Sequence, residues 1–78
     1  MNQTISRKNF NYKKLGKIVQ KARLSKGFTQ EKLAFYSNIS IRYLSDIENG
    51  KVNNPSLVKF WHISNALEMP ISEFLKEL

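Results

Sequence analysis

Apolar residues recur along the chain at helical spacing, in segments separated by polar, glycine or proline breaks. The first stripe, Leu15, Ile18, Val19 and Ala22, follows the i, i+3, i+4, i+7 pattern of one helix face. Further stripes follow, and no segment shows the sustained period of two that a half-buried strand requires. The pattern predicts an all-α domain of five short helices.

Residues that cap or break helices predict where these helices begin and end. Gly27 ends the first helix, and Asn38 suits the left-handed turn that follows a short second helix. Ser40 can cap the third helix, which Gly50 ends. Pro55 favours the start of the fourth helix, and the second proline separates it from a fifth.

The second and third predicted helices are short and are joined by three or four residues. This is the geometry of a helix-turn-helix unit, here about residues 29–49, whose second helix reads the major groove of DNA. Its inner positions are apolar and can lock the two helices together: Leu33, Ala34, Ile39, Leu44 and Ile47. A plain helical hairpin within a bundle is the structural alternative.

Charge is distributed unevenly along the chain. Residues 1–32 carry nine Lys/Arg and one acidic residue, a net +8, whereas residues 33–78 carry four Lys/Arg and five acidic residues, a net −1. The asymmetry favours a polyanionic partner over a merely solubilising surface.

We expect residues 1–11 to be a flexible basic arm and residues 12–78 a single domain. Arg7 and Lys8 of the arm can reach a groove, and a disordered tail is the alternative.

The residue pattern gives no support to an enzyme or a metal centre. The chain has no cysteine, one histidine and six scattered acidic residues, so we expect no catalytic set, no metal and no cofactor. No apolar run approaches the roughly 18 residues of a membrane span, and the first eleven residues lack a signal peptide's apolar core. We therefore expect a cytoplasmic protein with no membrane partner and no evident small-molecule effector.

A set of residues at fixed spacing runs through the helix-turn-helix and beyond: Thr29, Gln30, Leu33, Ala34, Ser40, Tyr43, Leu44, Ser45, Ile47, Glu48, Gly50, Asn54, Pro55, Ser56, Ala66 and Leu67. Together they resemble the lambda-repressor/Cro-like helix-turn-helix family, over roughly residues 15–78. Restriction–modification controller proteins and the DNA-binding half of SinR-type repressors are similar. The resemblance implies a compact five-helix DNA-binding domain. Such a domain would be a transcriptional repressor or controller that binds a near-palindromic operator in double-stranded DNA as a homodimer.

The resemblance also implies roles by position. The candidates for base contacts are Ile41, Arg42 and Asp46, and those for backbone contacts are Thr29, Gln30, Ser40, Tyr43, Ser45, Asn49 and Lys51. Arg23 and Glu48 correspond to a structural ion pair. The candidates for the dimer interface are Trp61, Ile71, Phe74, Leu75 and Leu78. Packing of the last helix onto the first is the alternative for each of these five.

Side-chain chemistry supports Arg42 independently, because its guanidinium fork can donate to guanine O6 and N7 together. Asp46 lies four residues later and can clamp that side chain or accept a hydrogen bond from cytosine N4. Ile41 can contact a thymine methyl group or pack at the start of the helix.

A second class of function is compatible with the sequence: a protein-interaction module, such as an antitoxin or adaptor, whose main partner is another protein. The aromatic and acidic C-terminal third motivates this alternative. Membrane-surface binding by the lysine-rich first helix is weaker, because the apolar stripe of that helix is needed for the core.

Overall fold

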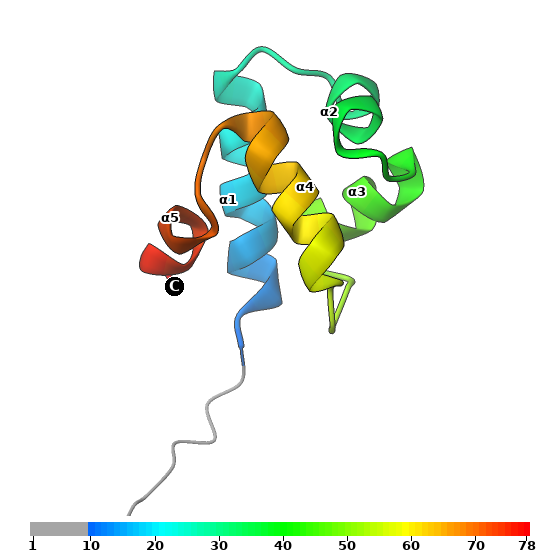
Figure 1. Ribbon diagram of the computed structural model, residues 1–78. Helices are drawn as coiled ribbons and strands as arrows, with labels where there is room; N and C mark the ends of the chain where they lie inside the picture. The colour runs from blue at the N-terminus through cyan, green and yellow to red at the C-terminus, as the bar shows by residue number, and fades with distance from the viewer. Residues whose placement is uncertain (1–9) are drawn as a thin grey trace, which may run out of the picture.

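The computed structural model describes residues 10–78, which contain the five predicted helices and no strand (Figure 1). The helices are α1 (Tyr12–Ser25), α2 (Gln30–Ser37), α3 (Ile41–Glu48), α4 (Leu57–Leu67) and α5 (Ile71–Lys76). None of these five is long and apolar enough to cross a membrane. Arg7, Lys8 and most of the predicted arm lie outside the described residues.

The longest helix, α1, is the centre of the arrangement. It packs against α3 on one side and α5 on the other, while α2 packs against α4 (Figure 1). All five helices contribute side chains to one core: Leu15, Ile18, Val19, Leu33, Ala34, Leu44, Ile47, Phe60, Ile63, Leu67 and Phe74. The core holds most of the apolar positions that the sequence predicted, although Leu57, Leu75 and Leu78 are exposed. The outer side of α3 is left to polar residues and Ile41.

Local capping accounts for the turn between α2 and α3. Thr29 Oγ1 accepts a hydrogen bond from the Lys32 N–H at 3.0 Å, and Ser40 Oγ accepts one from the Tyr43 N–H at 3.0 Å. Asn38 has the left-handed conformation, with φ 55° and ψ 45°. The predicted cap at Ser40 and the predicted left-handed turn at Asn38 are therefore confirmed.

The start of α4 differs from the prediction. The helix begins at Leu57 rather than Pro55, because Ser56 caps it and its Oγ accepts a hydrogen bond from the Lys59 N–H at 3.2 Å. After the helix, Glu68 adopts the left-handed conformation, with φ 54°. Glutamate is not favoured in that conformation, so no sequence rule identified it.

Two glycines bring α1 close to the carboxyl end of α3. A Cβ atom on Gly16 would lie 2.2 Å from the carbonyl oxygen of Ile47 and 2.7 Å from that of Glu48. A Cβ atom on Gly50, which has φ 71°, would lie 2.7 Å from Cα of Lys13. The two helices therefore meet backbone to backbone, and any side chain at either glycine would push them apart.

Candidate functional site

One side of α3 is polar and accessible. Arg42 is its most prominent residue, with a side chain that is 90% exposed. Ile41 and Asn49 are also exposed, and Ser45 and Asp46 are half-buried. The structure thus brings together all three candidates for base contacts and two of those for backbone contacts on the side of α3 that faces away from the core.

Arg42 and Asp46 form only a loose ion pair. Arg42 Nε lies 4.0 Å from Asp46 Oδ2, which is too long for a hydrogen bond. A solvent-exposed pair at this distance restrains its side chains weakly. The guanidinium of Arg42 is therefore available to a ligand outside the protein.

A buried ion pair fixes α3 to α1. Arg23 Nε donates to Glu48 Oε2 at 2.6 Å and Arg23 Nη2 donates to Glu48 Oε1 at 3.1 Å. The two side chains are only 9% and 1% exposed. Arg23 Nη1 also donates to the carbonyl oxygen of Phe28 at 2.8 Å. The predicted structural pair is confirmed, and it also holds the turn that precedes α2.

Gln30 joins the same network. Its Nε2 donates to Glu48 Oε1 at 3.0 Å, so the amide nitrogen of this candidate for a backbone contact has a partner inside the protein. Glu48 therefore accepts hydrogen bonds from both α1 and the first turn of α2. We name Arg23, Gln30 and Glu48 the Glu48 network.

Tyr43 is another candidate for a backbone contact whose polar group has a partner inside the protein. Its hydroxyl accepts a hydrogen bond from the Ser56 N–H at 3.1 Å, and the Lys59 ammonium lies 4.6 Å from the centre of its ring. Tyr43 therefore ties α3 to the start of α4, a role that sequence interpretation missed. Thirteen residues separate the two partners, and no local pattern indicates the contact.

Four further candidates for backbone contacts are exposed on the surface. Thr29 and Ser40 are exposed beside the hydrogen bonds by which they cap α2 and α3. Asn49 donates through Nδ2 to the carbonyl oxygen of Ser45 at 2.9 Å, which orients its amide at the end of α3. Lys51 is exposed directly after Gly50.

The candidates for a dimer interface divide into two groups. Phe74 has no exposed surface and its ring meets that of Phe60 at a centroid distance of 5.2 Å, so this candidate was wrong. Its position on α5 brings it into the core against α1 and α4, and it cannot contact a second protein. Trp61, Leu75 and Leu78 are 52%, 47% and 42% exposed.

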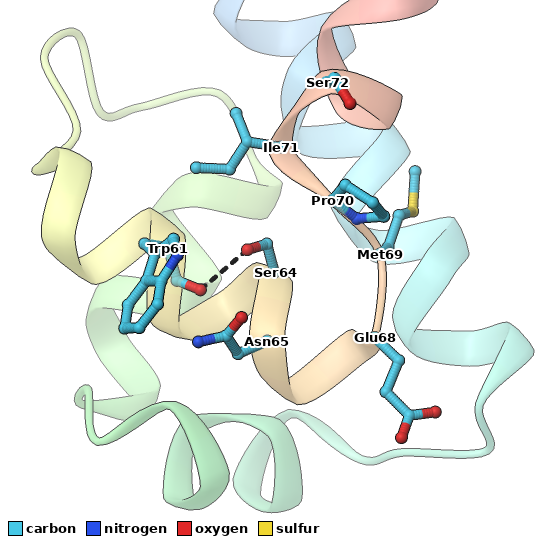
Figure 2. A pocket seen from close by; sticks show the side chains of 8 residues that line it. All are labelled: Trp61, Ser64, Asn65, Glu68, Met69, Pro70, Ile71 and Ser72. Atoms are coloured by element: carbon cyan, nitrogen blue, oxygen red, sulfur yellow. Dashed lines mark hydrogen bonds between the residues drawn. The ribbon is translucent and has the colours of Figure 1, made fainter.

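Trp61 and Ile71 border one shallow groove between α4 and the start of α5, as Figure 2 shows. Within the groove, Ser64 Oγ donates to the carbonyl oxygen of Trp61 at 2.8 Å. The groove is lined by Trp61, Ser64, Asn65, Glu68, Met69, Pro70, Ile71 and Ser72. It is distinct from the polar side of α3.

A helix-turn-helix family model matches residues 19–74, from the middle of α1 into α5. The chain belongs to the helix-turn-helix family. The matched segment contains α2, α3 and the whole Glu48 network. The predicted lambda-repressor/Cro-like resemblance and its five-helix fold are confirmed. This family and fold are those of DNA-binding regulators.

Members of the helix-turn-helix family with known roles are similar to this chain. The transcriptional regulator SlrR of Bacillus subtilis is 37% identical over 59 residues, which cover 76% of this chain and 39% of SlrR. The chain thus spans about two fifths of that curated relative.

Two solved structures of helix-turn-helix proteins are also similar. The restriction–modification controller protein C.AhdI of Aeromonas hydrophila superposes with a TM-score of 0.77 at 33% identity, covering 81% of this chain and 94% of C.AhdI. The biofilm regulator SinR, solved in complex with DNA, gives 0.75 at 28% identity, covering 78% of this chain and 97% of that structure.

Proposed function

We propose that this protein is a sequence-specific transcriptional regulator that inserts α3 into the major groove of double-stranded DNA. The observation that carries the proposal is the 90% exposed side chain of Arg42 on a helix that a buried network holds in place. A rigidly held helix can present its arginine fork to guanine O6 and N7. Membership of the helix-turn-helix family and similarity to SinR, solved with DNA, support this role.

The residues around Arg42 would supply the other contacts. The first turn of α2, Thr29 to Glu31, has backbone N–H groups without intrahelical acceptors, which suit a DNA phosphate. Ser45, Asn49 and Lys51 lie at or near the carboxyl end of α3, where they would contact the DNA backbone and fix the register of the helix.

Ile41 and Asp46 would adjust the choice of bases. Ile41, 46% exposed at the start of α3, would contact a thymine methyl group. Asp46, whose Oδ2 lies 4.0 Å from Arg42 Nε, would either restrain Arg42 or accept a hydrogen bond from cytosine N4. Its negative charge would also disfavour any register that brings a phosphate beside it.

We further propose that two copies bind a near-palindromic operator as a homodimer. The support is the exposure of three apolar side chains, Trp61, Leu75 and Leu78, and the position of Trp61 and Ile71 at the groove between α4 and α5. Two-fold symmetry would bring the two α3 helices into successive major grooves, about 34 Å apart. Operator occupancy at a promoter would then change transcription.

Selection of preferred duplexes from a random pool tests the main proposal. The wild-type protein should enrich one sequence, and Arg42→Ala should lose about 1–3 kcal/mol of discrimination at one base pair of that sequence. Lys76→Ala is the control, because it removes an exposed cation from α5. A wild-type protein that enriches no sequence would refute the function, and unchanged base preference in Arg42→Ala would refute direct reading by Arg42.

Sedimentation at micromolar protein tests the dimer. Wild-type protein on its selected duplex should sediment as two copies per DNA, and Trp61→Ser should shift that complex towards one copy. One copy per duplex at every wild-type concentration would contradict both the dimer and the near-palindrome.

A protein partner is the second candidate function, and a specific observation favours it. Phe35 is 80% and Tyr36 is 54% exposed on α2, with Phe28 packed against Tyr36 at a ring distance of 5.6 Å. Exposed aromatic residues that gather on one surface are characteristic of protein contacts. A stable complex with the product of a neighbouring gene, together with no enriched DNA sequence, would favour this function over DNA binding.

A further inference from the structure

Exposed lysines line one edge of α1. Lys13 and Lys17 are both exposed and stand four residues apart, so they lie on the same edge of that helix. We propose that Lys13 and Lys17, here named the α1 basic edge, bind DNA phosphates outside the bases that α3 reads. This inference rests on the proposed function and extends its contact surface to a helix outside the helix-turn-helix unit.

Backbone contacts bring the α1 basic edge beside the carboxyl end of α3. The chain at Gly50 packs on Lys13, since a Cβ atom on Gly50 would lie 2.7 Å from Cα and 3.1 Å from Cγ of Lys13. Gly16 lies one turn further on and abuts the last carbonyl groups of α3. Lys13 therefore lies beside the end of α3, and Lys17 follows one turn further along the same edge.

Lys51 extends the same surface from the loop after α3. Its backbone N–H donates to the carbonyl oxygen of Asp46 at 2.8 Å, which holds the loop against the end of the helix. Its side chain is exposed directly after the glycine that packs on Lys13. Cations from two separate segments thus converge at one end of α3.

These lysines have no anionic partner within the described part of the protein. The ion pairs among residues 10–78 involve the cations Arg23, Lys26, Arg42 and Lys76. The sequence of α1, YKKLGKIVQKARLS, contains no acidic residue. The ammonium groups of Lys13 and Lys17 are therefore available to an external anion.

Helix stability does not account for the charge on this edge. Lys13 lies in the first turn of α1, where the helix dipole disfavours a cation. Lys13 and Lys17 also repel each other at four-residue spacing, as do Lys17 and Lys21. Binding of an external polyanion would offset these unfavourable interactions. DNA fits better than an anionic membrane, because the apolar stripe of α1 is buried and cannot enter a membrane while the protein is folded.

Lys14 provides a matched control for Lys13. The two residues are neighbours in the first turn of α1, both are exposed, and each substitution by glutamine removes one charge. They point about 100° apart around the helix. The atoms nearest Gly50 belong to Lys13, while Lys14 lines the same surface hollow as Lys13 and Lys17. A comparison of Lys13→Gln with Lys14→Gln therefore separates position from net charge.

The measurement is the affinity for the selected duplex between 50 and 200 mM salt. Each lost phosphate contact should reduce the magnitude of the slope of log affinity against log salt by about 0.9 per protomer. The expected reduction is therefore about 0.9 for Lys13→Gln and about 1.8 for Lys13→Gln/Lys17→Gln. Lys14→Gln should keep the wild-type slope. The melting temperature of Lys13→Gln should equal or exceed that of the wild type, whereas a structural lysine would lower it.

Three results would overturn the inference. If the wild type binds its duplex and Lys13→Gln and Lys14→Gln have equal slopes, the α1 basic edge makes no positional contact, although the proposed function stands. If Lys13→Gln weakens binding only to vesicles of anionic lipid, the edge serves a membrane surface. If the wild type binds no duplex, the inference fails together with the proposed function.

Discussion

α1 contacts α3 and α5 in two different ways. Against α3 the contact is made by backbone at Gly16 and by the buried Arg23–Glu48 pair. Against α5 the contact is apolar, and its centre is Phe74, a fully buried side chain that also meets Phe60. Core side chains fill both contacts, and the contact with α3 adds directional hydrogen bonds.

The two contacts of α1 suit the different residues that α3 and α5 carry on their exposed sides. Hydrogen bonds of defined geometry fix both the distance and the rotation of α3, which carries Arg42 on its outer side. Apolar packing stabilises α5 without requiring one exact orientation of its exposed residues. We infer that substitutions at the two contacts will differ in what they do to DNA binding even where they cost similar stability.

The largest expected loss of stability is that of Phe74→Ala. Removing a fully buried phenylalanine ring should cost about 3–5 kcal/mol, a large share of the roughly 4–12 kcal/mol expected for a domain of this length. Urea denaturation measures this loss. At low temperature, where the variant is still folded, its preferred DNA sequence should be that of the wild type, because α3 is untouched.

Leu78→Ala is the control for Phe74→Ala, because Leu78 is 42% exposed beyond the end of α5 and should change stability by about 0.5 kcal/mol or less. An altered base preference in folded Phe74→Ala would show that α5 also positions α3. The proposed difference between the two contacts would then be wrong.

The next largest effect is expected for Glu48→Ala. Arg23 would lose both of its bonds to the carboxylate and remain buried without a counter-charge, at a cost of about 3 kcal/mol. Gln30 would lose its acceptor as well, so the first turn of α2 would also loosen. Unlike Phe74→Ala, this variant should lose DNA discrimination even under conditions where circular dichroism shows it to be folded.

Glu48→Gln is the intermediate case, because an amide oxygen can still accept from Arg23 or Gln30 but carries no charge. Its stability and its DNA discrimination should both lie between those of the wild type and Glu48→Ala. Wild-type discrimination in folded Glu48→Ala would mean that the backbone contact at Gly16 alone positions α3.

The features that could be predicted from the sequence depend on neighbours close in the chain. Asn38, Ser40 and Gly27 act through bonds and backbone angles within a few residues, and each does what its residue type predicts. The five helices follow from the spacing of apolar residues in the same way. The Arg23–Glu48 pair spans 25 residues, and only resemblance to a known family indicated it.

The features that could not be predicted depend on partners distant in the chain. Phe74 and Leu75 are adjacent apolar residues of one short helix, yet the first is fully buried and the second is 47% exposed. The orientation of α5 against α1 decides between them, and no local pattern contains it. The role of Gly16 could not be predicted for the same reason. The close contact at Gly16 depends on where the carbonyl groups of α3 lie in the folded protein.

Gly16→Ala tests the backbone contact directly and should have a smaller effect than Glu48→Ala. The added methyl group would press on the carbonyl oxygens of Ile47 and Glu48, at a cost of about 1–3 kcal/mol, which the better helix propensity of alanine, about 1 kcal/mol, offsets only in part. Because the strain is relieved by moving α3, DNA discrimination should fall as well.

Gly27→Ala is the matched control for Gly16→Ala. A Cβ atom there meets nothing within 4 Å, but φ 73° is strained for alanine, so about 1–2 kcal/mol should be lost without displacing α3. Equal DNA discrimination by the two folded alanine variants would show that close approach at Gly16 does not set the position of α3.

The smallest expected effect concerns an exposed ion pair that belongs to neither contact. Lys26, just after α1, donates to Glu68, just after α4, and this hydrogen bond and the charge of Lys26 hold the pKa of the Glu68 carboxyl below its usual value. Because the pKa is lower in the folded state, the pair stabilises the fold above the unfolded-state pKa. That contribution is lost as the pH falls through the folded-state pKa.

In Lys26→Gln, a carbon-detected NMR titration of Glu68 should give a higher pKa than in the wild type. Lys32→Gln, which removes a lysine from α2, should leave it unchanged. A Glu68 pKa that is the same in all three proteins would mean that the pair does not persist in solution, and the ends of α1 and α4 would then be held together by the core alone.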